Sequence, residues 1–258
     1  MNDKKKIAAV IPARMGSTRF PGKPLAMIKG LPMIEHVRRR ALLSRSVDQV
    51  YVATCDQEIL QAVQANGGQA IMTDAKHERC TDRVEEASRS FDADIIVIIS
   101  GDEPLLLPEI IDSLLEPYQQ NEEINCINLL STIRDENDLY NKDVVKAVMD
   151  KNNNILFFSR SAIPYLRVKK DFTFYRQTGI QAFTRDFLIK FSGLSSTPME
   201  IAESIDFLRI LEHGYQIKGV PFSKELCAVD RPGDVAVVET FLEQDPAQKK
   251  YHERIMKT

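Results

Sequence analysis

Three cationic residues, Arg14, Arg19 and Lys23, lie in one stretch rich in Gly and Pro, IPARMGSTRFPGKPL at residues 11–25. A long cationic side chain gains little from packing in such a loop, whereas Gly16 lets backbone N–H groups approach an anion closely. A nucleoside triphosphate requires such donors together with fixed cations. The stretch is neither a Walker A motif nor a dinucleotide-binding GxGxxG motif. We interpret it as a phosphate site; the alternative is an ordinary strand-to-helix loop with surface cations.

Two carboxylates far apart in the chain, those of Asp102 and Asp230, indicate a metal site. Asp102 follows a predicted strand at 94–100, and ligands of parallel sheets bind at the carboxyl ends of strands. Two carboxylates, completed by phosphate oxygens and water, give the octahedral shell that Mg²⁺ takes. The structural alternative is a turn with a helix-capping acid at Asp102 and an N-cap at Asp230 before Pro232.

The first hundred residues contain the elements that must position these groups. The predicted strands are 7–13, 49–54, 69–73 and 94–100, and the predicted helices are 32–43, a segment capped by Asp56, and 78–90. Continuous Val and Ile runs separated by helices are typical of a parallel sheet covered on both faces. The fold class is therefore predicted to be α/β.

The pattern is looser after residue 122, where some strands are expected to be antiparallel. The predicted strands are 124–132, 145–149, 155–158, 178–183 and 216–221, and the predicted helices are 198–213 and 232–241, with the last dozen residues frayed or in an exposed helix. No linker separates two domains, so we expect a single domain over residues 1–258.

Composition limits the class of protein. The 258 residues are 43% hydrophobic and 28% charged, with a net charge of −3. An acidic chain poor in aromatic residues argues against a nucleic-acid partner, and its apolar runs are too short for a membrane span. Four cysteines without a CxxC pair and no secretory leader favour a reducing cytoplasm.

Several other polar residues receive structural interpretations. Arg38, Arg39 and Arg40 are predicted to form the solvated basic face of a helix. The histidines have no metal-like spacing and are expected on helix surfaces, at His36, His77, His213 and His252. Cys80 is interpreted as a small loop residue rather than a reactive thiol.

The stretch at residues 11–25 resembles the signature of the 3-deoxy-manno-octulosonate (Kdo) cytidylyltransferase family, I-P-A-R-x-x-S-T-R-x-P-G-K-P-L. Similar motifs follow in the family's order to about residue 240, including GDEP at 101–104, FSR at 158–160 and VDRPGD at 229–234. The resemblance implies a Rossmann-like, mostly parallel sheet of the nucleotide-sugar transferase type. It also implies a homodimer, joined through a mixed-strand excursion at about 124–195.

The resemblance further implies Mg²⁺-dependent transfer of CMP from CTP to the anomeric hydroxyl of a 2-keto-3-deoxy sugar acid, with release of pyrophosphate. The implied catalytic residues are Arg14, Lys23, Asp102 and Asp230, of which Asp102 and Asp230 would hold the metal. The implied nucleotide-binding residues are Pro12, Ala13, Arg14, Gly16, Ser17, Lys23, Thr73, Thr81, Arg83 and Gly101. The implied substrate-binding residues are Arg19, Ser100, Arg160, Gln177, Gln181 and Asp206.

The chain departs from the family pattern in the implied sugar-acid pocket. The family's QGDEP begins with Ser100 here, HLGIY reads QTGIQ at 177–181, and a Glu-Gln pair is replaced by Asp206 and Phe207. These changes favour a different acceptor, and the alternative is a Kdo enzyme that tolerates drift. Two wider alternatives are a related nucleotidyltransferase acting on a nonulosonic acid or other acceptor, and a catalytically silent nucleotide-binding paralogue.

The implied dimer segment contains four phenylalanines, Phe157, Phe158, Phe172 and Phe174. They would suit a buried apolar patch between two subunits. The alternative is a cluster within one chain.

Overall fold

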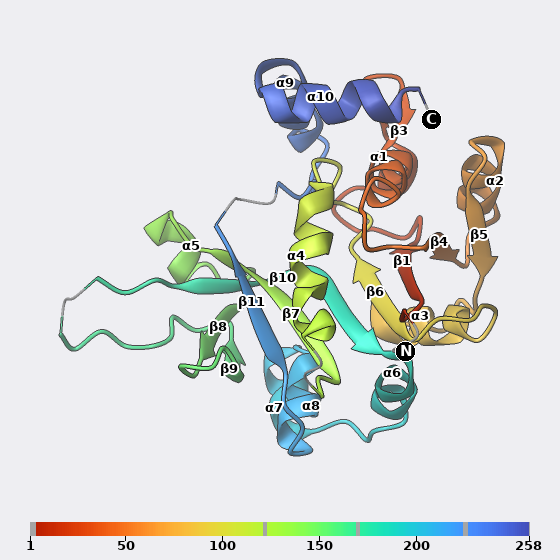
Figure 1. Cartoon of the computed structure of the whole chain (residues 1–258). Helices are drawn as coiled ribbons and strands as arrows, with labels where there is room; N and C mark the ends of the chain where they lie inside the picture. The colour runs from red at the N-terminus through yellow and green to blue at the C-terminus, as the bar shows by residue number, and fades with distance from the viewer. Residues whose placement is uncertain (1–3, 121–122, 169–170, 224–226, 258) are drawn as a thin grey trace. The chain divides into compact units, whose positions relative to one another are not determined.

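The computed structural model describes residues 4–120, 123–168, 171–223 and 227–257. The chain divides into two compact units. Unit 1 comprises residues 1–115 and 226–258, and unit 2 comprises residues 116–225. Figure 1 labels the elements of both.

The sheet of unit 1 consists of four parallel strands in the order β6, β1, β4, β5. They are β6 (Ile95–Ile99), β1 (Ile7–Ala13), β4 (Gln49–Thr54) and β5 (Gln69–Met72). β6 is buried along its whole length and β1 almost so, as continuous Val, Ile and Ala runs require. The predicted parallel sheet is confirmed, and the carboxyl ends of β1 and β6 meet at one edge.

Helices connect these strands as the pattern predicted. They are α1 (Met33–Ala41), α2 (Gln57–Ala65) and α3 (Cys80–Ser88), followed by α9 (Asp234–Gln244) and α10 (Pro246–Ile255) near the end of the chain. The chain crosses from β1 to β4 to β5 through α1 and α2 and returns to β6 through α3. Right-handed crossovers therefore place α3 on the opposite face from α1 and α2. Between β1 and α1 lie the short helix η1 (Lys23–Leu25) and the hairpin strands β2 (Met27–Ile28) and β3 (Leu31–Pro32).

The prediction of a solvated basic face on α1 is wrong. Arg38, Arg39 and Arg40 are all buried. Arg38 and Arg39 both donate to the fully buried carboxylate of Glu35. Arg40 donates to the Leu106 carbonyl at 3.1 Å, and burial lowers the pKa of its guanidinium to about 10.

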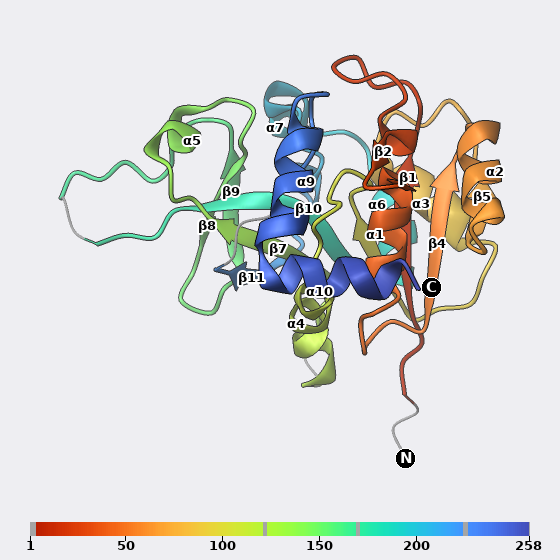
Figure 2. The same ribbon diagram turned by 90° about the horizontal axis from the view of Figure 1, so that it is seen from above.

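The prediction of a surface position is also wrong for His36. Both views show α10 lying across one end of α1 (Figures 1 and 2), and the rings of His36 and His252 stack there at 5.6 Å. The Nε2 of His36 lies 2.8 Å from the Ile28 carbonyl and must carry the proton, since a carbonyl only accepts. Helix α10 therefore closes the core of unit 1.

Unit 2 contains a mixed sheet. Strand β7 (Cys126–Thr132) lies between the antiparallel β10 (Tyr175–Thr184) and the parallel β11 (Lys218–Phe222). Strand β8 (Lys146–Met149) pairs antiparallel with both β10 and β9 (Ile155–Ser159). The register between β7 and β10 shifts between Gln177 and Gln181, which marks a bulge.

Five described helices accompany this sheet, and the sequence predicted a helix only over 198–213, so the first three of the five were missed. They are α4 (Pro108–Gln119, shared with unit 1), α5 (Glu136–Tyr140), α6 (Arg185–Ser192), α7 (Pro198–Glu203) and α8 (Phe207–Glu212). The single helix predicted over 198–213 is two helices, because Ser204 adopts a left-handed conformation with φ 52°. Aromatic side chains fill the core beside them. Phe158 packs edge-on against Phe207, so it belongs to a cluster within the chain.

Candidate active site

Lys23 lies at the centre of the predicted site in unit 1. Its ammonium is 2.6 Å from Oδ2 of Asp102 and 3.8 Å from Oδ1 of Asp230, and it donates to the Val229 carbonyl at 2.9 Å. The side chain is only 15% exposed. The structure thus brings together three residues that are widely separated in the sequence.

The backbone fixes the two carboxylates relative to each other. The Val229 N–H donates to the carbonyl of Asp102 at 2.9 Å, which ties the segment before Asp230 to the loop after β6. Ser100 at the end of β6 donates its hydroxyl to Oδ1 of Asp102 at 2.6 Å. Because strand ends and a main-chain bond hold both acids, their placement does not depend on side-chain packing alone.

Arg19 and Asp234 complete this network. Arg19 lies 3.0 Å from Oδ1 of Asp230, so it currently binds a carboxylate of the protein. Asp234 accepts the N–H groups of Asp230 and Arg231, and these bonds lower the pKa of its carboxyl. The turn at 230–234 therefore holds Asp230 beside Lys23.

The loop after β1 holds the remaining predicted phosphate ligands. Arg14 and Gly16 are exposed, while the Met15 N–H donates to Asp56 at 2.8 Å. Asp56 begins α2 as predicted, but its side chain makes no capping bond and anchors this loop instead. Sequence reasoning missed that role. The signal available was an acid directly after the carboxyl end of β4.

Three small residues bring backbone to this edge of the sheet. Pro12 and Ala13 end β1, and Gly101 follows β6. A Cβ atom on Gly101 would lie 3.2 Å from the Pro12 carbonyl, tighter than ordinary contact. Ser17 accepts the Phe20 N–H at 3.3 Å. The edge is therefore closely packed backbone with exposed cations beside it.

The segment that holds the implied nucleotide-binding residues Thr73 and Thr81 is built around Arg83. This buried side chain on α3 donates to the hydroxyl of Thr73 at 2.6 Å and to the His77 carbonyl at 3.4 Å. Thr81 is also buried. Arg83 thus holds the segment in shape, which leaves contact with a base to the backbone and neighbouring side chains.

The other predicted substrate residues lie in unit 2. Arg160 donates to the backbone carbonyls of Glu203, Lys142 and Ser204. Asp206 occupies the N-cap of α8 without a side-chain capping bond. Gln177 is half-buried on β10.

Gln181 and its cross-strand partner Asn128 form a buried pair of amides. They face each other in the β7–β10 register, and both amide groups donate to the Thr178 carbonyl, at 3.3 and 3.5 Å. Among the described residues, neither amide oxygen has a hydrogen-bond partner. Asn128 was missed because it lies within an apolar strand pattern. A buried acceptor without a donor costs about 1–3 kcal/mol.

The residues in unit 1 fit a magnesium ion. Carboxylate oxygens are the ligands that Mg²⁺ prefers, and it binds through one or two of them together with substrate phosphates and water. The Lys23 ammonium between Asp102 and Asp230 shows that a cation is favourable there. No cluster of three or more His, Cys, Asp and Glu suited to a metal occurs within the described residues. A metal held there would have these two carboxylates as its ligands from the protein.

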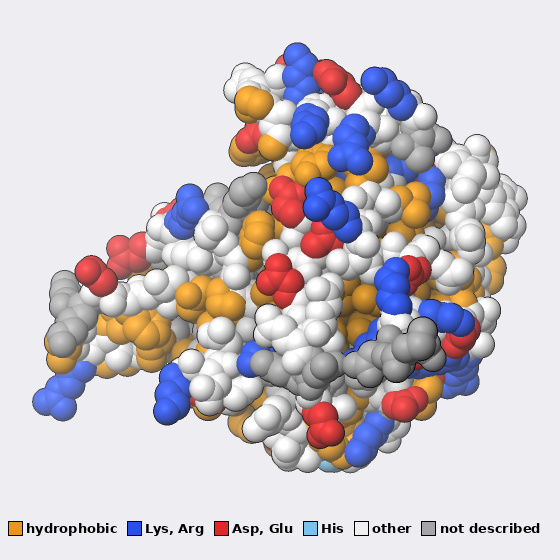
Figure 3. Space-filling model, in the orientation of Figure 1, with side chains coloured by type: hydrophobic (Ala, Val, Ile, Leu, Met, Phe, Trp, Pro, Cys, Tyr) orange, Lys and Arg blue, Asp and Glu red, His pale blue; other side chains and the backbone are white. Residues whose placement is uncertain are grey.

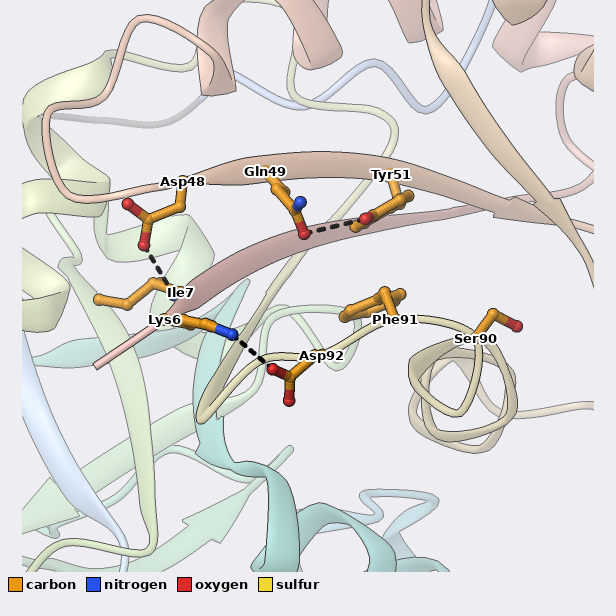
Figure 4. Close-up of a pocket in the computed structure, with 8 residues that line it drawn as sticks. All are labelled: Lys6, Ile7, Asp48, Gln49, Tyr51, Ser90, Phe91 and Asp92. Carbon is orange, nitrogen blue, oxygen red and sulfur yellow. Dashed lines mark hydrogen bonds and ion pairs between the residues drawn. The ribbon is translucent and has the colours of Figure 1, made fainter. Parts of the chain in front are cut away.

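A separate hollow of about 580 Å³ lies at the opposite end of the same strands (Figure 4). The stacked rings of Tyr51 and Phe91 line it, beside an exposed ion pair between Lys6 and Asp92. It borders the first residues of β1 and β4, whereas the predicted site borders their last residues. None of the predicted site residues lies in it.

Comparisons with known proteins show which family the chain resembles. The family model described as cytidylyltransferase matches residues 8–218. The curated 3-deoxy-manno-octulosonate cytidylyltransferase of Geobacter metallireducens is 43% identical, with 89% of this chain and 95% of that protein covered. The enzyme of the same name from Fusobacterium nucleatum is 39% identical, with coverages of 93% and 98%.

This chain belongs to the Kdo cytidylyltransferase family.

A solved structure described as CMP:2-keto-3-deoxy-manno-octonic acid synthetase complexed with CTP matches with a TM-score of 0.89 at 38% identity. The match covers 93% of this chain and 99% of the solved chain. A cytidylyltransferase from Leptospira borgpetersenii matches with a TM-score of 0.65 at 20% identity, which shows the shared fold. The predicted fold class is confirmed, and as a family member the chain is a nucleotidyltransferase. No described helix has the length and apolar character to cross a membrane.

Proposed function

We propose that the protein transfers CMP from CTP to the anomeric hydroxyl of Kdo or a Kdo-like sugar acid. The anomeric oxygen forms a bond to the α-phosphorus of CTP, the bond from that phosphorus to the bridging oxygen breaks, and pyrophosphate leaves. The observation that carries the proposal is the network of Lys23, Asp102 and Asp230 at the carboxyl edge of a parallel sheet. Nucleotidyl transfer needs this kind of positioning and charge neutralisation.

Each residue of unit 1 then has a chemical role. Arg14 and Lys23 bind the triphosphate and stabilise negative charge that develops on pyrophosphate. Asp102 and Asp230 hold Mg²⁺, which when bound polarises the α-phosphate and lowers the pKa of the attacking hydroxyl. In the structure, the Lys23 ammonium lies between the same two acids.

The remaining contacts divide between base and acceptor. Backbone N–H groups at the carboxyl edge, at Ala13, Gly16, Ser17 and Gly101, donate to phosphates, while Pro12, which has no N–H, lines the edge beside them. The segment from Thr73 through Thr81 to Arg83 reads the base. Arg19 and Arg160 bind the acceptor carboxylate, for which an arginine fork is suited. Ser100, Gln177, Gln181 and Asp206 contact its hydroxyl groups.

A pyrophosphate-release assay tests the proposal with CTP, Mg²⁺ and a panel of 2-keto-3-deoxy sugar acids, nonulosonic acids among them. We expect turnover with CTP that stops when the metal is chelated. CTP binding without turnover of any acceptor would favour the silent paralogue. Turnover of a nonulosonic acid alone would favour the related transferase.

We further propose a homodimer formed through residues 124–195. In unit 2, Leu156, Tyr165, Val168 and Phe172 are large exposed hydrophobic residues. Figure 3 shows hydrophobic side chains gathered along the segment between β9 and β10. Phe158 is excluded from this patch because it is buried in its own chain. Light scattering at micromolar concentration should give about twice 29.3 kDa, and a monomer mass would contradict the proposal.

The cellular setting stays a prediction. The four cysteines form no disulfide with one another, and a reducing cytoplasm is what the sequence predicts.

A further inference from the structure

Arg160 is held by an unusual number of contacts, all within unit 2. Its Nε donates to the Glu203 carbonyl at 2.7 Å, Nη1 to the Lys142 carbonyl at 2.8 Å and Nη2 to the Ser204 carbonyl at 3.4 Å. A guanidinium has five N–H donors. Within the described residues, one N–H on each terminal nitrogen is thus left to bind a ligand.

Lys146 fixes the backbone of Arg160 from one side. Its side chain is fully buried on β8, and its ammonium donates to the carbonyls of Asn141, Val144 and Arg160 at 2.8, 2.7 and 2.5 Å. The three protons of the ammonium therefore meet three carbonyl oxygens. Burying a charge is costly unless such bonds compensate it, and an apolar side chain would fill the same space without that cost. The lysine joins the loop before β8 to the end of β9.

Glu203 fixes the same backbone from the other side. Its carboxylate accepts the Ser159 hydroxyl at 2.7 Å and the Arg160 N–H at 2.9 Å, and its own carbonyl accepts Nε of Arg160. Ser159 pairs directly with Lys146 across β8 and β9. Both polar groups of the Arg160 main chain are thus bound by oppositely charged side chains from different elements, β8 and α7.

We propose that Lys146 and Glu203 are positioning residues that clamp the main chain of Arg160, so that its guanidinium is aimed at the carboxylate of the acceptor. This inference rests on the proposed role of Arg160 in acceptor binding. Neither residue touches the acceptor. Their effect is to reduce the motion of Arg160, so their loss weakens acceptor binding and leaves CTP binding unchanged.

The test compares steady-state kinetics of four variants with the best acceptor of the panel. Lys146→Met and Glu203→Leu each remove one side of the clamp, and Arg160→Ala removes the guanidinium that the clamp positions. Glu203→Gln keeps it, because the Ser159 hydroxyl can rotate to accept from the new amide while the amide oxygen accepts the Arg160 N–H. Lys151→Met, at an exposed lysine of the same unit, is the matched control.

We expect Lys146→Met and Glu203→Leu to raise the KM for the acceptor about tenfold with less than a twofold change in the KM for CTP. Glu203→Gln and Lys151→Met should stay within twofold of the wild type. Adding Arg160→Ala to either clamp variant should raise the KM no further than Arg160→Ala alone, since both changes remove one interaction.

Other outcomes overturn the proposal. If Glu203→Leu leaves the KM for the acceptor unchanged while Arg160→Ala raises that KM strongly, Arg160 remains a ligand but the clamp is rejected. Additive effects in the double variants would do the same. An unchanged acceptor KM in Arg160→Ala would reject its role in the proposed function and the clamp with it. If Lys146→Met does not fold, the comparison of Glu203→Leu with Glu203→Gln decides.

Discussion

In unit 1, the predicted residues come from the carboxyl ends of parallel strands, and opposite charges pair directly, as Lys23 does with Asp102. In unit 2, the predicted residues lie on the antiparallel strand β10 with its bulge, directly after β9 and directly before α8. The polar groups of Arg160 and Gln181 meet backbone carbonyls. The amide oxygens of Gln181 and Asn128 have no described partner. The family signature is nearly complete in the first region and altered in the second.

This difference indicates how the two halves of such an enzyme can diverge. Main-chain bonds and strand ends fix the proposed triphosphate site, so we expect changes of its residues to abolish the reaction. An acceptor pocket built from side chains can be altered one hydrogen bond at a time. The following predictions test whether unit 1 governs the nucleotide step and unit 2 only the choice of acceptor.

The largest effect is expected from the carboxylates of unit 1. Asp102→Asn and Asp230→Asn should each reduce kcat by about 10²–10³, or about 2–4 kcal/mol of transition-state stabilisation, because a ligand charge of the metal is lost. Pyrophosphate release at saturating CTP and Mg²⁺ measures this. Asp48→Asn is the matched control, since Asp48 pairs with Lys4 at the other end of the sheet. Near-normal turnover in either site variant would remove that residue from the metal site.

The second largest effect is expected on stability at low pH, where a buried histidine of unit 1 should lower the free energy of unfolding. Burial, together with Arg40, His252 and Arg39, lowers the pKa of His36 to about 4. The unfolded chain, with an ordinary value near 6.5, therefore binds the proton more tightly. The free energy of unfolding should fall by up to about 3 kcal/mol as the pH drops from 6.5 to 4.

Urea unfolding across that pH range measures the loss. His36→Gln should flatten the dependence, because an amide can still donate to the Ile28 carbonyl but does not titrate. His213→Gln, at an exposed position of unit 2, should leave the dependence unchanged. Equal pH dependence in the wild type and His36→Gln would refute the assignment.

The smallest effect is expected in unit 2. Kdo should be at least tenfold worse in kcat/KM than the true acceptor, because Gln177 and Gln181 replace a histidine and a phenol of the family pattern. The double variant Gln177→His, Gln181→Tyr should recover activity with Kdo and leave the KM for CTP unchanged. Efficient turnover of Kdo by the wild type would instead identify the substitutions as neutral drift.

The sequence predicted most of unit 1 because its signals are local. Continuous apolar runs at 7–13 and 94–100 can form only buried strands, and the residues after them must reach the sheet edge. The prediction was weakest where the neighbours of a side chain decide whether it is buried or solvated. Arg38 and Arg39 resemble a solvated face on the helix alone, but Glu35 supplies a buried counter-charge and the Ile255 carbonyl of α10 accepts from Arg39.

By itself, the sequence determined the α/β class and the family, and it predicts the phosphate-binding loop, since these depend on short-range pattern and motif. Only the tertiary structure decided that Lys23 lies between Asp102 and Asp230, that Ser204 divides a predicted helix, and that Lys146 and Glu203 hold Arg160. These contacts join segments tens to hundreds of positions apart. Residue order does not encode them directly, because burial and hydrogen-bond satisfaction are settled only when the whole chain packs.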